Sequence, residues 1–378
     1  MSVIAACGTS SADPAPPGGG LFGGDARAVA AAFVPSHLVQ GTVPSGGPDV
    51  TVTGNPTTID TDHLTIDGKT SAYFVLRNGY AVLSGNRVVL DHDVVIIGPR
   101  PLIIAAEGDV TVTASIDLSA HGSAPGPGAA TFGAGEGGPG DTFITPGGAA
   151  RVSSGGGGGG HGSPGAAGGD SEGEIIPPGV GGMVYGAQLA DRLIGGAPGG
   201  AGGDGGTAGG AGGGALQISS ATSISITGPH IAAGGGGGEG GGGSASGGAG
   251  AGAGGELFLE APVLTIASTL AANGGGGGGG GGEAGQPQGG TDGSDGLIGA
   301  APAPGGVGGI PMGSDGGAGA AGTSASFLGA QPGSGGNSNG GGGGGGAGRI
   351  WLRYEAATPP VTTGAVISPP ATLDPTLP

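Results

Sequence analysis

The chain has 378 residues, of which 106 are glycine and 30 are proline, a share far above that of ordinary globular domains. Its formal net charge is −18 with only nine Lys and Arg, which argues against nucleic-acid binding and against electrostatic docking on anionic lipid. No apolar run is long enough to predict a transmembrane helix, and the single cysteine excludes an internal disulfide or a multi-cysteine zinc site.

The first twenty residues, "MSVIAACGTSSADPAPPGGG", contain the short motif Ile4-Ala5-Ala6-Cys7. This motif resembles a bacterial lipobox, in which Cys7 is the lipid attachment site, and the Pro/Gly/Ser-rich run after it predicts a flexible tether over residues 1–20. A secretory signal needs a basic start and a longer apolar core than the six residues before Cys7. Either the true start lies upstream of Met1 or the likeness is accidental.

Residues 21–49 are expected to form an N-terminal cap region. The run "DARAVAAAFV" favours a short helix, with Asp25 as its N-cap before an alanine-rich stretch. A helix of this length is suited to covering the end of a larger structure.

From about residue 50 to residue 122, apolar and polar residues alternate in short runs separated by Gly, Asn or Asp, which predicts closely spaced β-strands. The connections are too short for crossover helices. Antiparallel hairpins fit this spacing, and so does a solenoid in which each strand turns a corner and lies on the preceding coil.

An internal repeat favours the solenoid. Segments beginning at Pro101, Gly214, Gly255 and Gly348 share two apolar residues spaced by one, a gap, two more spaced by one, and a single Ile or Leu. We therefore expect an all-β, parallel β-helix, begun by residues 50–122 and continued through residues 123–368. The positions expected to lie over one another are Leu216/Ile218, Ile224/Ile226 and Ile231 over Leu257/Leu259, Leu264/Ile266 and Leu270.

Glycine-rich fields interrupt the repeat at one point, over roughly residues 122–214, 234–254 and 274–348. Insertions at a fixed repeat position emerge side by side at one corner of the coils. Polyglycine can pack as threefold extended helices, a polyglycine II bundle, or behave as a flexible coil. We expect packing, with larger residues such as Glu239, Ala249 and Ala251 on the outside, and a disordered tail over residues 369–378.

Two aspartate pairs, "DTDH" at Asp60 and Asp62 and "DHD" at Asp91 and Asp93, are the candidate metal ligands. Each pair is expected to share one strand face, and stacked carboxylates can hold calcium. A polysaccharide lyase would also need a basic residue, for which Arg77, Arg87 and Arg100 are the local candidates. The alternative interpretation is that these aspartates are outward polar residues marking corners. "TDGSDG", from Thr291, places two carboxylates on a turn without a longer ligand series.

The segments "GPRPLIIAAEGDVTVTASIDLSAHG", "VYGAQLADRLIGGAPGGAGGDGG" and "GGGALQISSATSISITG" resemble the glycine-rich secreted proteins and lipoproteins of predatory soil bacteria. The resemblance covers roughly residues 95–368. It implies export, a β-helical scaffold with glycine loops and a place on the outer cell surface, and it implies no assigned activity.

These observations predict a non-enzymatic, surface-anchored structural or adhesive protein of the cell envelope or extracellular matrix, exported to the outer membrane, the cell surface or the medium. It would use no cofactor, attach to membrane only through a lipid anchor, and make weak multivalent contacts with polysaccharide or with sibling surface proteins. The alternative is a calcium-dependent polysaccharide lyase or glycan-binding protein on the same scaffold. An ice-binding glycine bundle is a third reading, but it needs flat rows of Ala, Ser or Thr more regular than these.

Overall fold

The structure is a computed structural model and is all-β over the residues that it describes. The described ranges are 34–39, 43, 45–52, 54–130, 142–144, 151–171, 176–185, 192–204, 207–243, 246–282, 288–311, 313–322, 333–334 and 339–377. Cys7 and the helix expected after Asp25 lie outside them. Within these ranges no helix is long and apolar enough to cross a membrane.

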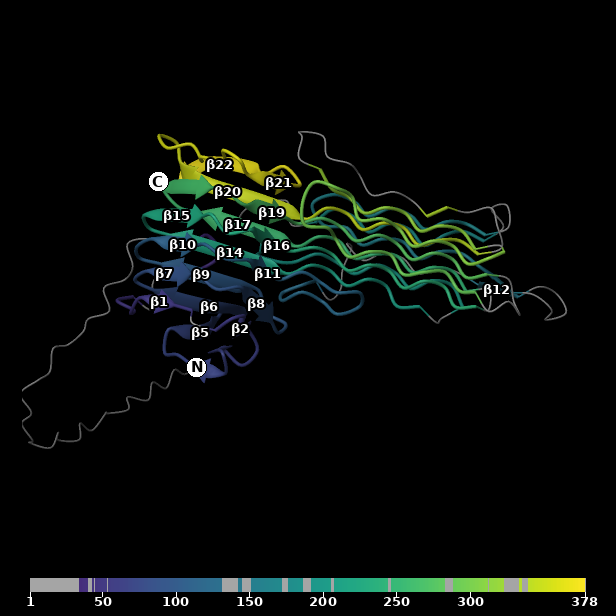
Figure 1. The fold of residues 1–378 in the computed structure, drawn as a ribbon, viewed down its shortest axis with the longest axis horizontal. Coiled ribbons are helices and arrows are strands. Elements are labelled where there is room, and N and C mark those ends of the chain that lie inside the picture. Colours follow the sequence, from purple (N-terminus) through teal and green to yellow (C-terminus); the bar gives the residue numbers. More distant parts are fainter. Residues whose placement is uncertain are drawn as a thin grey trace, which may run out of the picture.

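Most strands belong to three mostly parallel sheets that form one block, the β block (Figure 1). Sheet 1 contains β1 (Val50–Thr51), β7 (Val88–Leu90), β10 (Val110–Val112), β15 (Ser223–Ile226) and β18 (Val263–Ile266), in that spatial order. Sheet 2 contains β4 (Lys69–Thr70), β3 (Thr65–Ile66), β2 (Thr57–Asp60), β8 (Val94–Ile97), β11 (Ile116–Asp117), β16 (His230–Ala232), β19 (Thr269–Ala271) and β21 (Val366–Ser368).

Sheet 3 contains β5 (Phe74–Arg77), β6 (Tyr80–Gly85), β9 (Leu102–Ala106), β14 (Ala215–Ser220), β17 (Glu256–Glu260), β20 (Arg349–Glu355) and β22 (Thr372–Leu377). From β6 to β19, apart from an antiparallel pair formed by β12 (Thr142–Ile144) and β13 (Arg151–Ser153), the chain visits sheets 3, 1 and 2 in turn. Each return adds a strand beside the preceding one.

The expected ladder positions are confirmed. Leu216 and Ile218 lie opposite Leu257 and Leu259, and Ile231 lies opposite Leu270. In sheet 1, Ile224 and Ile226 lie opposite Leu264 and Ile266. These side chains are at most 1% exposed and share one core with the equivalent residues of β9, β10 and β20. Each fully buried aliphatic side chain contributes roughly 1.5–3 kcal/mol, so the side chains of several adjacent strands together stabilise the block.

Both ends of the β block differ from the repeat. At the N-terminal end, β2, β3 and β4 pair antiparallel, as do β5 and β6, so hairpins close that end. At the C-terminal end, β22 pairs in parallel with β20. The prediction of a disordered tail is therefore wrong for residues 372–377, where Leu373 lies opposite Leu352 and extends sheet 3.

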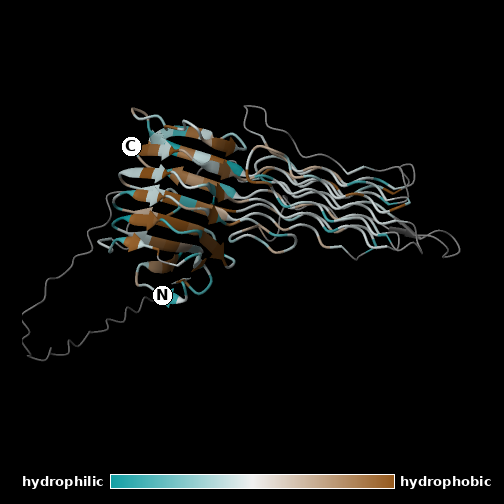
Figure 2. Ribbon diagram, in the orientation of Figure 1, coloured by the Kyte–Doolittle hydropathy of each residue, from teal (hydrophilic) through white to brown (hydrophobic). Residues whose placement is uncertain are grey.

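All three glycine-rich fields leave sheet 2 and re-enter at sheet 3, after β11, β16 and β19. Their extended segments run side by side away from the β block as a separate body, the glycine bundle (Figure 1). Figure 2 shows the contrast in hydropathy, with apolar strands in the block and nearly neutral segments in the bundle.

Hydrogen bonds within the glycine bundle follow a period of three. Along Gly274–Gly282, consecutive N–H groups donate in rotation to three different neighbouring segments. The three series run from Gly274, Gly277 and Gly280 to Ala320, Gly317 and Ser314; from Gly275, Gly278 and Gly281 to Gly252, Ala249 and Ser246; and from Gly276, Gly279 and Gly282 to Ser294, Thr291 and Gln288. Its carbonyls accept from three more segments, within residues 235–241, 306–309 and 342–345, so six neighbours surround it.

Candidate functional site

The two aspartate pairs lie at corners of the β block and not on strand faces as expected. Strand β2 ends at Asp60, so Asp62 lies in the following turn, and Asp91 and Asp93 lie between β7 and β8. The parallel register of β2 and β8 sets Asp93 beside Pro56, four residues before Asp60. That separation is about 13 Å along the strand, so the pairs do not share one groove.

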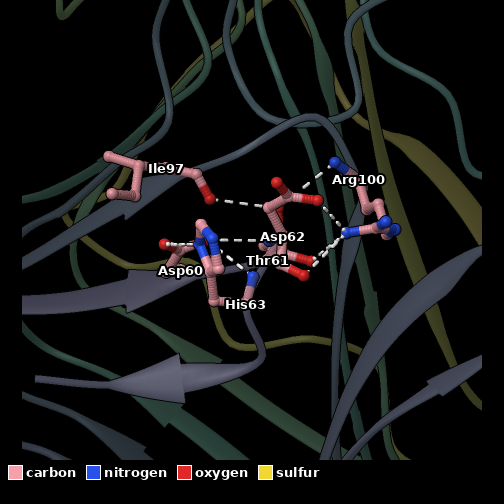
Figure 3. Close-up of polar contacts among 6 residues, drawn as sticks. All are labelled: Asp60, Thr61, Asp62, His63, Ile97 and Arg100. Carbon is pink, nitrogen blue, oxygen red and sulfur yellow. Dashed lines mark hydrogen bonds and ion pairs between the residues drawn. The ribbon is translucent and has the colours of Figure 1, made fainter. Parts of the chain in front are cut away.

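Asp60 and Asp62 form hydrogen bonds and an ion pair that stabilise the turn after β2 (Figure 3). The Asp60 carboxylate accepts bonds from the backbone N–H groups of Asp62 and His63 and lies 2.8 Å from His63 Nδ1. These bonds lower the pKa of Asp60 against the opposing effect of desolvation, which is the largest single influence on it. The Asp62 carboxylate forms an ion pair of 2.6 Å with Arg100, whose Nη1 also donates to the carbonyl of Thr61.

The second pair and the remaining arginines are also engaged separately. Asp91 lies 2.9 Å from His92 Nδ1, and Asp93 accepts the Ser115 N–H at 3.0 Å. Arg77 donates to the Leu76 carbonyl, and Arg87 helps to lower the pKa of Asp109 after the larger effect of Ser223 and Thr222. Across the part of the chain that the structure describes, no group of three or more His, Cys, Asp or Glu is placed to hold a metal ion. Nothing in this geometry favours a shared calcium site.

The glycine bundle is the most distinctive part of the molecule, and along Gly274–Gly282 its interior leaves no room for a side chain. A Cβ atom added at any position from Gly274 to Gly282 would overlap a backbone carbonyl of a neighbouring segment. Neighbouring backbones can approach this closely only where neither residue directs a side chain into the contact. Every N–H in this run is nevertheless bonded, so the dry interior has no unpaired donor there.

Two of the three larger residues expected on the outside of the bundle lie inside it. Ala249 and Ala251 are fully buried, because their segment is itself surrounded by six neighbours and offers no solvent-facing position. Glu239 is half-buried on an edge segment, where its carboxylate accepts the Ala208 N–H at 2.7 Å.

Carboxylates bind N–H groups at the edges of the bundle, a role that the sequence did not reveal. Asp292 accepts the Gly240 N–H at 2.8 Å, and Asp295 accepts the Gly237 N–H at 2.8 Å, so both partners recur every three residues. "TDGSDG" therefore lies in an extended segment and not on a turn. The three-residue spacing of its aspartates, matching a threefold helix, was the available signal.

A buried ionisable cluster lies where the bundle meets sheet 3. His161 is fully buried, donates from Nδ1 to the Gly254 carbonyl at 2.9 Å, and stacks on Tyr185 at 4.9 Å between ring centroids. Since that contact is a carbonyl, Nδ1 carries the proton, and Nε2 has no partner. Desolvation lowers the pKa of His161 to about 4. Arg349 donates to the Tyr185 carbonyl at 2.8 Å.

Glu256 completes this cluster. It is 4% exposed, and its Oε2 accepts the Ile194 N–H at 3.1 Å. Burial raises its pKa to about 8, against the opposing effects of that bond and of Arg349. Glu256 and His161 are thus both closed off from solvent where the bundle joins the block.

A second buried polar network lies on the outer face of sheet 3, under residues 34–38, which we call the strap. The carboxylate of Glu260, fully buried, accepts the N–H and hydroxyl of Ser36 and bonds from Gln217 and Ser219 at 2.7 Å. Leu38 packs with Phe258 and Trp351 on the same face. Residues 34–38, from the region expected to cap an end, thus cover part of the side of sheet 3.

Comparison with known proteins gives no relative to guide these assignments: no family model, curated protein or solved structure matches the chain.

Proposed function

We propose that the β block is a three-sided parallel β-helix and that the glycine bundle is a polyglycine II bundle growing from one of its corners. The support for the β-helix is the cyclic order of the sheets and the like-over-like register of the ladders. The support for the bundle is the threefold rotation of donors along Gly274–Gly282 among six neighbours.

On this scaffold we propose a non-enzymatic structural or adhesive role at the cell surface. The observation that carries the proposal is the bundle itself, a projecting body whose interior is held by backbone hydrogen bonds. Such a surface favours weak, repeated contact with polysaccharide or with sibling proteins over recognition of one small substrate. Export and a lipid on Cys7 would place the block at the membrane through the tether, with the bundle outside.

The anchor is tested in cells that naturally produce the protein. Mass spectrometry of Cys7 from the membrane fraction is expected to find acyl chains, and Cys7→Ser is expected to release the protein into the soluble fraction. Unmodified Cys7 in a membrane-bound protein, or no change in fractionation on substitution, would contradict the lipid anchor.

The adhesive role is tested by deleting the gene and measuring attachment of cells to one another and to insoluble envelope polysaccharide. The intact protein is expected to restore attachment, whereas Gly277→Ala, which introduces a methyl where Gly342 O lies, is expected to fail. Equal rescue by a variant shown to have a disrupted bundle would rule out the bundle as the adhesive part.

A further inference from the structure

Two edges of the glycine bundle carry the same apolar ridge. Pro177–Met183 reads "PPGVGGM" and Pro304–Ile310 reads "PGGVGGI". In each, a Pro, a Val and a Met or Ile recur every three residues, and all six are exposed. Val180 and Met183 are 70% and 61% exposed, and Val307 and Ile310 are 64% and 67% exposed, whereas the glycines between them pack inward.

The two ridges lie on separate edges. The first bonds to the segments at residues 155–158 and 165–168, and the second bonds to segments at residues 277–280, 291–294 and 316–319. They have no hydrogen-bonded neighbour in common. One copy of the chain therefore presents two ridges in two different directions.

The ridges run in opposite directions. The first is parallel to Gly155–Gly160, which is parallel to the segment that enters β20. The second is parallel to Gly274–Gly282, which leaves β19. Met183 and Pro304 are thus nearer the β block, and Pro177 and Ile310 are nearer the tip.

The middle valines of the two ridges lie at similar heights. Close backbone contacts between neighbouring segments show which residues lie at the same height. Val180 lies level with Gly157 and Gly250, and Val307 lies level with Gly279 and Gly248. Only the step from Gly250 to Gly248 changes the height, by roughly 6 Å at the 3.1 Å rise of such a helix. With side chains about 9 Å apart along each ridge, this offset lets the ridges of two upright copies interdigitate.

Charge points to the same partner. The chain carries −18 overall, so two copies repel each other over most of their surface. Neither ridge contains or adjoins a charged residue in sequence, from Ile176 to Tyr185 and from Leu297 to Ser314. In space, the carboxylate of Asp315 lies beside the second ridge, where it accepts the Gly308 N–H at 2.8 Å. The six ridge side chains themselves are uncharged, so two copies that meet through them place apolar side chains at the centre of the contact.

We propose that the ridge at Pro177–Met183 of one copy packs against the ridge at Pro304–Ile310 of a second copy, joining the bundles laterally into rows. The contact is heterologous, so it repeats from copy to copy. Anchoring all copies upright on one surface, as in the proposed function, would align the ridges and add many weak contacts together.

Disulfide cross-linking of the purified full chain tests this contact. In a Cys7→Ser background, which removes the single natural cysteine, Pro177→Cys and Val307→Cys proteins are mixed and oxidised. In two upright copies these positions differ in height by only roughly 3 Å, because Pro177 lies about 9 Å nearer the tip than Val180. A mixed disulfide needs Cα atoms within about 7 Å, so it reports direct apposition. We expect the mixed dimer to form at least tenfold faster than with the control Val361→Cys, a valine 53% exposed on the β block.

A chain carrying both ridge cysteines is expected to give a ladder of multimers, whereas either single variant stops at dimers. Equal rates with Val307→Cys and Val361→Cys, or no mixed dimer, would overturn the lateral contact. Because these proteins lack Cys7, a negative result leaves the membrane anchor standing. A positive result with no lipid on natural Cys7 would remove the anchor and leave the contact.

Discussion

Glycine in the bundle is required by space and not only by flexibility. A Cβ added at Gly277 would lie 2.1 Å from Gly342 O, far inside normal contact distance, whereas at Gly242, on the bundle edge, the nearest atom is Ser246 Oγ at 3.5 Å. Neither glycine has a positive φ. The two positions therefore separate the steric effect from the backbone effect.

Gly277→Ala is expected to destabilise the protein by about 1–3 kcal/mol or more, because the neighbouring backbone must move. Gly242→Ala is expected to change stability by less than about 0.5 kcal/mol. Differential scanning calorimetry of the three proteins measures both effects. Equal midpoints for Gly277→Ala and the natural protein would show that the interior is not closely packed.

The buried pair at the junction predicts opposite pH effects. The native protein holds a proton on Glu256 that the unfolded chain releases, so stability falls as pH rises from about 4.5 to about 8. The unfolded chain binds a proton on His161 that the native protein excludes, so stability falls as pH drops from about 6.5 to about 4.

Glu256→Gln is expected to remove the loss of stability on the alkaline side while keeping an acceptor for the Ile194 N–H. Urea unfolding from pH 4 to pH 9 measures the profile, and Glu355→Gln, at an exposed glutamate, serves as the control. A profile for Glu256→Gln that still falls between pH 5 and pH 8, as in the natural protein, would place the titrating group elsewhere.

At the scale of elements, the strap ties the N-terminal part of the chain to the middle of sheet 3. Glu260 is a central contact of the strap, since its carboxylate accepts from Ser36 as well as from Gln217 and Ser219. His37 Nδ1 also lies 2.6 Å from Gln217 Oε1, and Arg353 donates to the Ser36 hydroxyl. An amide in that place has one acceptor oxygen and an NH₂ group that faces donors.

Glu260→Gln is therefore expected to loosen the strap at a cost of about 1–3 kcal/mol, while the ladders of the β block persist. Limited proteolysis is expected to cut the variant near residues 34–50 at a higher rate, with cleavage of β14 to β20 unchanged. Uniform cleavage along the chain would mean that the strap is needed for the block to fold.

The ladders could be predicted because each sequence repeat has the same apolar spacing, and Ile224 beside Leu264 followed directly from aligning the repeats. The hairpins at β2 to β6 could not, because short alternating strands fit parallel and antiparallel pairing equally well. The strap escaped notice because Ser36 and Glu260 are 224 residues apart, with no local pattern linking them.

The site residues were harder to predict than the fold. Asp60 and Asp93 are close in sequence to strands that do pair, but a register of four residues separates them. Ala249 and Ala251 were expected to face outward because a segment considered alone has an outer side, whereas in a bundle several segments deep these residues are surrounded by neighbouring segments.

For the whole molecule, the decisive property is whether polyglycine is as ordered as the β-strands. Hydrogen–deuterium exchange is expected to show peptides covering Gly274–Gly282 protected as strongly as those of β17, because every amide in this run is bonded. Exchange at the rate of an unstructured chain would contradict the bundle.

The bundle joins all three glycine-rich fields in one row of bonds, in which Gly156 donates to Gly248 and Gly248 donates to Gly340. Some N–H groups of its central segments thus donate to carbonyls of residues that are synthesised last. A ribosome that stops before residue 339 would release a chain whose middle amides remain unsatisfied, and such a product is a ready substrate for proteases. Only the full-length polypeptide can therefore satisfy all of these hydrogen bonds.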